Sequence, residues 1–256
     1  MDLFRDDPMA RPLTYPGRLP GTSGVLVGDR FVPLRPVAGA PPERWRADRE
    51  RLGDLLGRLG RAPMTARHPV VAVGSNASPA QLRRKYAGRP AGPVLPMTLA
   101  VVPGLAPGVS AHVSRWGYVP AAPIEAPGES WRLFVLWPDD DELAALDATE
   151  PNYLRLPLPS RSGPVTAESG APLPPCSVYV GRHGCLAGAD GRARRLTGQA
   201  ELIQALLDES PALRALCGGT PADFLAAVRE TATREAARAL FRAERRALPQ
   251  PGLNPA

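Results

Sequence analysis

The stretch VVAVGSNASPAQ, residues 70–81, decides the fold of this 256-residue chain. Its apolar residues Val70–Val73 predict a short buried strand. The strand ends at the turn Gly74-Ser75-Asn76, where glycine lets the backbone turn tightly. Ser78-Pro79-Ala80-Gln81 then predicts a helix to about Tyr86, with serine as the cap, proline at the first helical position and glutamine completing a capping box. A strand, turn and helix in this order offer backbone N–H groups to an anion.

The chain divides around this stretch into three parts. Residues 1–69 are rich in proline and glycine, which predicts a loop-rich N-terminal extension with a short hairpin around Gly28-Asp29 and one helix over Glu43–Leu59. No catalytic pattern stands out in this extension. Residues 70–195 predict an α+β domain, and residues 196–256 predict a helical segment packed on it.

The middle of the chain alternates between strand and helix signals. Aromatic and β-branched residues make Trp131–Trp137 the clearest strand, and Asp139 is suited to cap the short helix that follows. Four further segments are predicted to be extended: Thr98–Val102, Val109–Tyr118, Tyr153–Leu158 and Cys176–Val180.

The last part of the chain has helical periodicity. Thr197 and Ser210 each suit the start of a helix, and a capping box at Thr220 opens one long amphipathic helix that ends at Leu248. The polar face of that helix carries Arg238, Arg242, Arg245 and Arg246. A solvated face is the commoner meaning of such a pattern, and contact with an acidic partner is the alternative.

Composition and charge exclude several classes of protein. The net charge is +6, but arginines are interspersed with acidic residues, which favours a solvated surface over nucleic-acid binding. The three cysteines lack CxxC spacing and the three histidines form no metal motif, so we expect no disulfide framework, metal or cofactor. Neither a signal-peptide core nor a membrane-length apolar stretch is present, which predicts a cytoplasmic protein. Abundant alanine, arginine and proline are typical of a GC-rich bacterial genome.

A second motif lies downstream of the clearest strand. Leu146-Asp147-Ala148-Thr149-Glu150 is followed closely by Tyr153-Leu154-Arg155. Together with the earlier Gly74-Ser75-Asn76, and with Trp116-Gly117 between them, this order of motifs resembles the gamma-glutamyl cyclotransferase-like family. The resemblance covers residues 70–180, the size of one ordinary domain.

The resemblance implies a fold and an activity. The implied fold is α+β, a small mixed β-barrel or sheet with flanking helices, to which this chain adds its C-terminal helical segment. The implied activity is a cofactor-free lyase or transferase reaction that releases 5-oxoproline from a gamma-glutamyl amine or peptide. Glu150 is then the general acid/base, and its site is expected to be partly dry, because a carboxylate with an ordinary pKa of about 4.3 is a weak base.

The same resemblance implies which residues bind the substrate. The turn Gly74-Ser75-Asn76 would offer N–H groups to the substrate carboxylate or to the oxyanion. Tyr153 or Tyr179 would add a hydroxyl group, and Arg155 would either add a positive charge or pair with a surface carboxylate.

Two positions depart from the family pattern and leave alternatives open. Val73 stands where the family has tyrosine, and Pro151 stands where it has glycine beside the glutamate. Both are compatible with a changed substrate, and equally with an inactive small-molecule-binding or interaction module whose terminal additions cover the cavity or form a homodimer surface. The expected partner is a small molecule with a gamma-glutamyl-like group, rather than nucleic acid or a membrane. A cavity between Gly74 and Glu150 would favour the enzyme.

Overall fold

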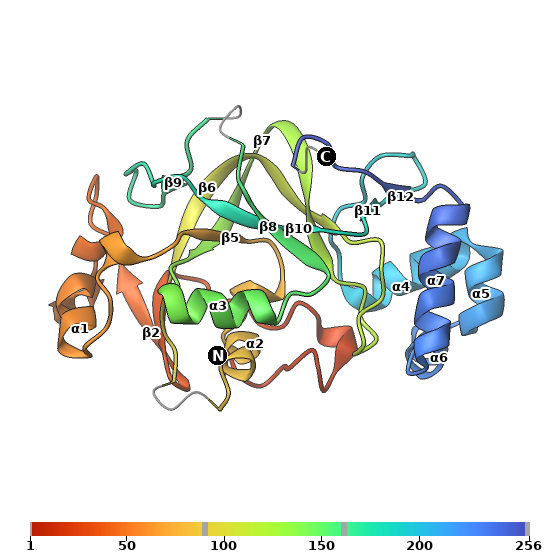
Figure 1. Cartoon of the computed structure of the whole chain (residues 1–256), viewed down its shortest axis with the longest axis horizontal. Coiled ribbons are helices and arrows are strands. Elements are labelled where there is room, and N and C mark those ends of the chain that lie inside the picture. The colour runs from red at the N-terminus through yellow and green to blue at the C-terminus, as the bar shows by residue number, and fades with distance from the viewer. Residues whose placement is uncertain (1, 89–91, 160–162, 254–256) are drawn as a thin grey trace.

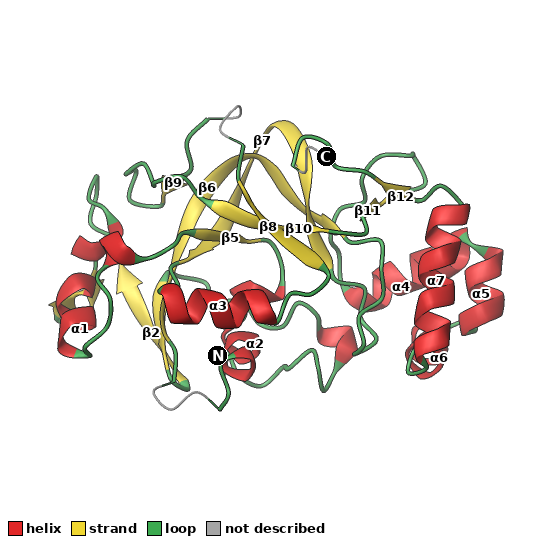
Figure 2. Cartoon of the chain, viewed as in Figure 1, coloured by secondary structure: helices red, strands yellow, loops and turns green. Residues whose placement is uncertain are grey.

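The computed structural model describes residues 2–88, 92–159 and 163–253. It is a mixed α+β fold with a twisted sheet in the middle (Figure 1). Helix α1 and the strands of the N-terminal part lie at one end of the molecule, and the C-terminal helices lie together at the other end. Colouring by secondary structure makes this division visible (Figure 2).

The sheet is an open path of strands. Its order is β4-β3-β2-β1-β6-β7-β5-β10-β8, and β9 pairs with β6 off this path. The mixed sheet expected from the sequence is confirmed, because β5 and β10 are parallel and the other pairs are antiparallel. Among the described residues the path does not close into a barrel. The strands are β1 (Gly24–Val27), β2 (Arg30–Arg35), β3 (Arg46–Ala47), β4 (Glu50–Arg51), β5 (Val70–Ala72), β6 (Val94–Val109), β7 (Ala121–Leu136), β8 (Tyr153–Pro157), β9 (Thr166–Ala167) and β10 (Ser177–Gly181).

The helices flank this sheet or form the C-terminal segment. They are α1 (Leu52–Arg58), α2 (Pro79–Lys85), α3 (Asp140–Ala148), α4 (Gln199–Glu209), α5 (Pro211–Cys217), α6 (Pro221–Ala227) and α7 (Thr231–Ala243). Short 3-10 turns include η1 (Pro12–Thr14), η2 (Pro42–Arg44), η3 (Met64–Ala66) and η4 (Ser75–Ala77). A separate pair of strands, β11 (Cys185–Leu186) and β12 (Ala247–Leu248), ties the end of the chain to the segment after β10. No helix among the described residues is long and apolar enough to cross a membrane.

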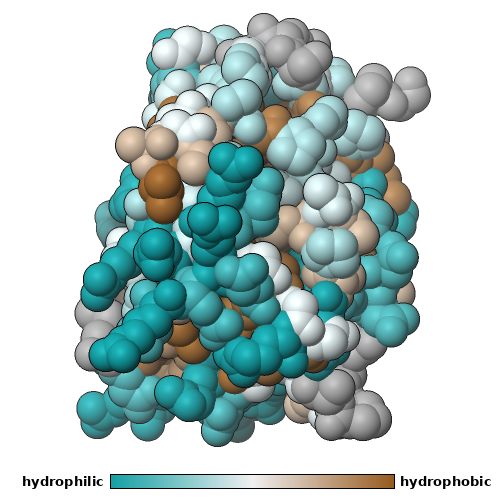
Figure 3. All heavy atoms as spheres, turned by 90° about the vertical axis from the view of Figure 1, so that its left-hand side faces the viewer, coloured by the Kyte–Doolittle hydropathy of each residue, from teal (hydrophilic) through white to brown (hydrophobic). Residues whose placement is uncertain are grey.

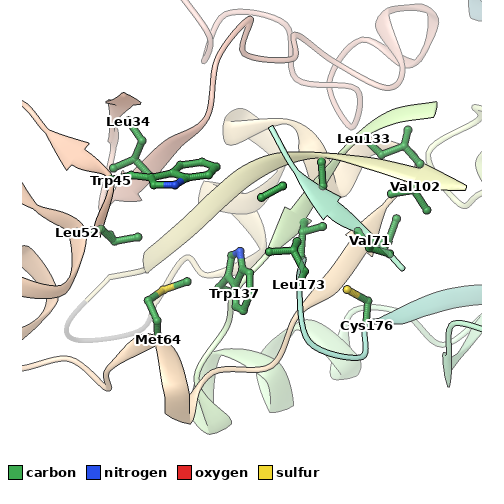
Figure 4. Packing of buried hydrophobic residues seen from close by; sticks show 14 of the residues in the cluster. Leu34, Trp45, Leu52, Met64, Val71, Val102, Leu133, Trp137, Leu173 and Cys176 are labelled. Carbon is green, nitrogen blue, oxygen red and sulfur yellow. The ribbon is translucent and has the colours of Figure 1, made fainter. Parts of the chain in front are cut away.

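The hydrophobic core has a main cluster and a separate helical cluster. In the main cluster Trp45 and Leu52 of the N-terminal part pack with Val71 and Trp137 around the centre of the sheet (Figure 4). The helical cluster joins α4–α7 to the end of β6 and the loop after it. At the α1 end, hydrophilic side chains cover most of the surface, with small apolar areas between them (Figure 3).

Residues 1–69, expected to be a loop-rich extension, contribute four strands to the sheet. The hairpin predicted around Gly28-Asp29 is confirmed, and its first strand β1 pairs with β6 in the main sheet. The helix predicted over Glu43–Leu59 is wrong in its first half, because Arg46–Arg51 forms the tight β3–β4 hairpin and only Leu52–Arg58 is helical. Burial of Trp45 against Leu52 and its neighbours outweighs the helical spacing of the apolar residues there.

Two other expectations are corrected. Val109–Tyr118 is not a strand: β6 ends at Val109, and the residues beyond it turn back toward β7. The long helix expected from Thr220 to Leu248 is two helices, because α6 ends before Arg229 and α7 begins at Thr231. Each helix contributes a buried phenylalanine to the same cluster, α6 through Phe224 and α7 through Phe241.

A buried ion pair fixes helix α3 under the sheet. Asp139 caps this helix as predicted, in a capping box with Glu142. The carboxylate of Glu142 accepts hydrogen bonds from the guanidinium of Arg67 at 2.9 Å and from the Val94 N–H at 2.8 Å. Burial raises the pKa of Glu142, and the neighbouring Arg67 opposes that rise. Glu142 thus joins α3 to the segment before β5 and to the first residue of β6.

We expect Glu142→Ala to lower the free energy of unfolding by about 3–5 kcal/mol, because it leaves the Arg67 charge buried without its partner. Urea unfolding followed by circular dichroism measures the change. The control is Glu201→Ala on the exposed surface of α4, with an expected change within about 0.5 kcal/mol. Equal losses in the two variants would contradict the importance of the buried pair.

Candidate functional site

A cavity of about 610 Å³ lies where the sequence motifs meet. Its walls come from the N-terminal segment, β5 and the turn after it, α2, the loop between β6 and β7, and the connection from α3 to β8. Aromatics make up only 5% of the chain, yet four of its five tyrosines line this cavity: Tyr15, Tyr118, Tyr153 and Tyr179. This concentration of hydroxyl-bearing rings marks the cavity as the candidate site.

Glu150 is held at the cavity wall by the end of helix α3. Thr149 is the C-cap, and its hydroxyl donates to the Leu146 carbonyl at 2.7 Å. The Glu150 N–H donates to the Asp147 carbonyl, and the Glu150 carbonyl accepts from the Tyr153 N–H. The spacing of the Leu-Asp-x-x-Glu motif therefore produces a fixed turn that carries the glutamate into the cavity.

The Glu150 carboxylate forms a compact polar cluster with Asn76 and Lys85. Its Oε1 accepts from the Asn76 Nδ2 at 2.9 Å and from the Lys85 Nζ at 2.5 Å. The same Nζ donates to the Asn76 Oδ1 at 2.8 Å. The side chains of Lys85 and Glu150 are only 6% and 13% exposed, so the partly dry surroundings expected for Glu150 are present.

The two oxygens of this carboxylate have different surroundings. Oε1 takes both hydrogen bonds of the cluster. For Oε2, the described part of the chain provides no hydrogen-bond donor, and Glu150 lines the cavity. Oε2 is therefore the oxygen available to a bound molecule.

Close packing requires a glycine at position 74. A Cβ atom added there would lie 2.6 Å from the Ala121 Cβ and 2.7 Å from the Tyr15 hydroxyl oxygen. The turn was expected to need glycine for its tightness, and the structure adds a second reason: the chain after β5 must pass between these two groups.

The anion site expected at the turn is smaller than predicted. The N–H groups of Ala77 and Ser78 donate to the carbonyls of Gly74 and Ser75. Helix α2 has only seven residues, and the Ser78 side chain makes no cap hydrogen bond, so the predicted capping box does not form. Among the described residues, the Asn76 N–H has no acceptor and stays available to a ligand.

The tyrosines expected to contact the substrate are already engaged. The Tyr153 hydroxyl donates to the Ala121 carbonyl at 2.7 Å, and the Tyr179 hydroxyl donates to the Asp147 Oδ1 at 2.6 Å. Arg155 pairs with Asp147 at 3.0 Å and lies outside the residues that line the cavity. Tyr153 and Tyr179 thus form walls, and Arg155 takes the second of its two expected roles, pairing with a carboxylate outside the cavity lining.

Val73 and Pro151 line the cavity without filling it. Val73 packs against the cluster of Tyr15, Tyr118 and Ala121. The rings of Tyr15 and Tyr118 stack with centroids 4.4 Å apart, and they supply the aromatic wall that the valine lacks. Gly74 and Glu150 therefore line one cavity in which Val73 and Pro151 are wall residues.

Buried His112 adds a neutral ring to the back of the cavity. Its Nδ1 lies 2.7 Å from the Ser110 hydroxyl oxygen. Burial, together with the nearby His183 and Arg238, lowers the pKa of His112 to about 3. The imidazole is therefore uncharged near neutral pH and contributes no positive charge to the site.

Lys85 is the functional residue that the sequence analysis missed, although composition gives a signal for it. The chain has 31 lysines and arginines, and Lys85 is its only lysine. A chain that uses arginine at every other cationic position has kept the compact ammonium group where a carboxylate and an amide oxygen converge. Tyr15 was missed too, because nothing local in the N-terminal segment connects it with residues 74–76.

The Lys85–Glu150 pair can be tested through stability alone. We expect a double-mutant cycle of Lys85→Ala and Glu150→Ala to give a coupling energy of about 1–3 kcal/mol, because each change leaves the other charge poorly solvated. Urea unfolding of the four proteins measures this coupling. The control pair is Arg214–Asp208, whose side chains are 49% and 54% exposed and whose coupling should be much weaker. Equal coupling in the two pairs would contradict the description of Lys85 as a buried partner.

The comparisons with known proteins give only distant structural likenesses. No family model and no curated protein matches the chain. At3g28950.1 of Arabidopsis thaliana is 18% identical with a TM-score of 0.34, and the match covers 45% of this chain and 62% of that one. The human protein loc79017 is 16% identical with a TM-score of 0.34, with coverage of 45% and 66%. At5g39720.1 of Arabidopsis thaliana is 18% identical with a TM-score of 0.36, with coverage of 56% and 85%. The chain thus spans less than two-thirds of the first two structures, and at these TM-scores the likenesses add nothing to the fold described above.

Proposed function

We propose that this protein is a gamma-glutamyl cyclotransferase-like enzyme that releases 5-oxoproline from a gamma-glutamyl amine or peptide. The observation that carries the proposal is the placement of Glu150. Its Oε1 is held by Asn76 and Lys85 while its Oε2 remains available at the wall of a cavity of about 610 Å³. One fixed and one available oxygen suit a carboxylate that must take up and release protons without moving.

The reaction needs little from the protein beyond positioning and proton transfer. The substrate ammonium gives a proton to the Glu150 Oε2, and the resulting amine attacks the γ-carbonyl carbon of the same molecule. The carbonyl oxygen becomes an oxyanion. When the carbonyl re-forms, the bond to the departing nitrogen breaks and that nitrogen takes the proton from Glu150. The ring nitrogen still carries one proton more than the lactam needs, and Glu150 transfers this proton to the departing amine. The amine therefore leaves as an ammonium ion. Because the nucleophile is tethered to the carbonyl, folding the substrate in the cavity supplies much of the rate enhancement.

Lys85 and Asn76 support this role of Glu150. They fix the carboxylate through Oε1, so the proton-accepting oxygen faces the substrate in a constant position. The Asn76 N–H, which has no acceptor among the described residues, suits the α-carboxylate of the glutamyl group. Tyr153 and Tyr179 line the same cavity, whose volume of about 610 Å³ suits a small molecule.

We expect the purified protein to release 5-oxoproline from at least one member of a panel of gamma-glutamyl peptides and amines, and Glu150→Gln to abolish this release. The amide keeps the volume of the carboxylate but accepts no proton. Chromatography with mass detection measures 5-oxoproline directly. The control Glu235→Gln, on the exposed surface of α7, should keep full activity. Release that persists in Glu150→Gln would remove Glu150 as the base.

The alternative on the same cavity is a binding module without turnover. The engagement of Oε1 by two partners and the presence of Pro151 beside Glu150 favour this alternative. It predicts that gamma-glutamyl compounds bind, as measured by calorimetry, but stay intact after prolonged incubation. Product formation at any rate that depends on Glu150 decides for the enzyme.

A further inference from the structure

The N-terminal segment forms part of the site, although the sequence gave it no functional pattern. Residues 2–23 run along the cavity and contribute Met9 and Tyr15 to its wall. The segment is attached to helix α2, which also carries Lys85: Asp7 pairs with Arg84, and the guanidinium of Arg83 lies 4.7 Å above the Phe4 ring. Its own Asp6 pairs with Arg18, which closes the segment around Tyr15.

Packing and a hydrogen bond fix the Tyr15 hydroxyl beside the turn Gly74-Ser75-Asn76. The side chain is buried, and its ring stacks on Tyr118. The hydroxyl oxygen accepts from the Ala121 N–H at 2.8 Å, and Ser75 lies beside it. It lies so close to Gly74 that no side chain fits between them.

The Tyr15 hydroxyl has few hydrogen-bond acceptors within reach. The Ala121 N–H only donates, so the hydroxyl hydrogen of Tyr15 points away from it. Its remaining choices are the Ser75 hydroxyl and a molecule in the cavity. Tyr153 and Tyr179 differ in this respect, because their hydroxyls already donate to protein oxygens. Burial raises the pKa of Tyr15 to about 12 despite the Ala121 and Ser75 donors, so the hydroxyl keeps its hydrogen under ordinary conditions.

We propose that Tyr15 is a catalytic residue of this site, and that its hydroxyl donates a hydrogen bond to the substrate carbonyl oxygen as that oxygen becomes negative. The proposal rests on the function proposed above. It assigns to the N-terminal segment the stabilisation of the oxyanion, which the turn at residues 74–76 was expected to provide. A donor that is already held by the Ala121 N–H and by stacking of its ring on Tyr118 costs little reorganisation when the charge develops.

The same oxygen remains in the product, because the γ-carbonyl of the substrate becomes the ring carbonyl of 5-oxoproline. Tyr15 therefore contacts the product as well as the transition state. The contact is stronger in the transition state, where the oxygen carries charge, so loss of the hydroxyl lowers kcat more than it weakens binding.

The test compares Tyr15→Phe with Tyr86→Phe. Tyr86 is the fifth tyrosine, fully buried outside the cavity, and its hydroxyl donates to the Glu142 carbonyl at 3.1 Å. Both variants lose one buried hydroxyl and keep the ring, so thermal unfolding shows whether each remains folded. Steady-state release of 5-oxoproline gives kcat and KM, and calorimetric titration with 5-oxoproline itself gives an affinity that does not depend on turnover.

We expect Tyr15→Phe to lower kcat about 100-fold or more with little change in KM. We expect it to weaken 5-oxoproline binding about tenfold, while Tyr86→Phe changes neither. An unchanged kcat in Tyr15→Phe, or a loss no larger than in Tyr86→Phe, overturns the proposal and leaves the proposed function in place. A wild-type protein that binds 5-oxoproline through Tyr15 but turns over no substrate overturns the function and keeps Tyr15 as a ligand donor. A protein with neither turnover nor 5-oxoproline binding overturns both.

Discussion

The contact of Lys85 with Glu150 and Asn76 is the interaction on which the candidate site depends. It joins the turn after β5 and the last residue of α2, which are nine residues apart, to the second residue after α3, 65 residues further along the chain. Each member has its partners in the other two, so none of the three groups is left buried without a partner. Separating any one of these groups from its partners would leave it buried and unpaired, which costs free energy. This penalty keeps the turn, α2 and the end of α3 in place, and so fixes the position of the available Glu150 Oε2.

The identity of the cation matters as much as its charge. An ammonium group is small enough to donate to the Glu150 Oε1 and the Asn76 Oδ1 at once, at 2.5 and 2.8 Å. A guanidinium is planar and larger, and its fork would demand both carboxylate oxygens, which would occupy Oε2. The single lysine of an arginine-rich chain therefore preserves an available oxygen.

Sequence patterns predicted the elements whose causes are local. The Asp139 cap, the hairpin around Gly28-Asp29 and the strand before Gly74 each follow from neighbouring residues and were found as expected. The expectations that failed depend on distant contacts. Around the buried Trp45, a hairpin forms in place of the first half of the helix predicted over Glu43–Leu59. The helix predicted from Thr220 to Leu248 forms as α6 and α7, which pack Phe224 and Phe241 into one cluster. The motifs located Glu150 and Asn76, but Tyr15 enters the site through a fold that places residues 15 and 121 together.

The three parts of the chain recognised from composition, the N-terminal extension, the middle domain and the C-terminal helical segment, all contribute to the site. The C-terminal segment holds the loop that carries Tyr118: the Gln199 side chain bonds both the N–H and the carbonyl of Val119, at 2.9 and 2.8 Å. Gly117 in the same loop lies against α6, since a Cβ there would meet Leu225 at 3.0 Å. Tyr118 in turn stacks on Tyr15 from the N-terminal segment. The N-terminal segment and the loop held by the C-terminal segment thus meet beside Gly74. All three parts of the chain therefore shape the cavity, and we expect a change in either terminal part to act on the site through the stacked rings of Tyr15 and Tyr118.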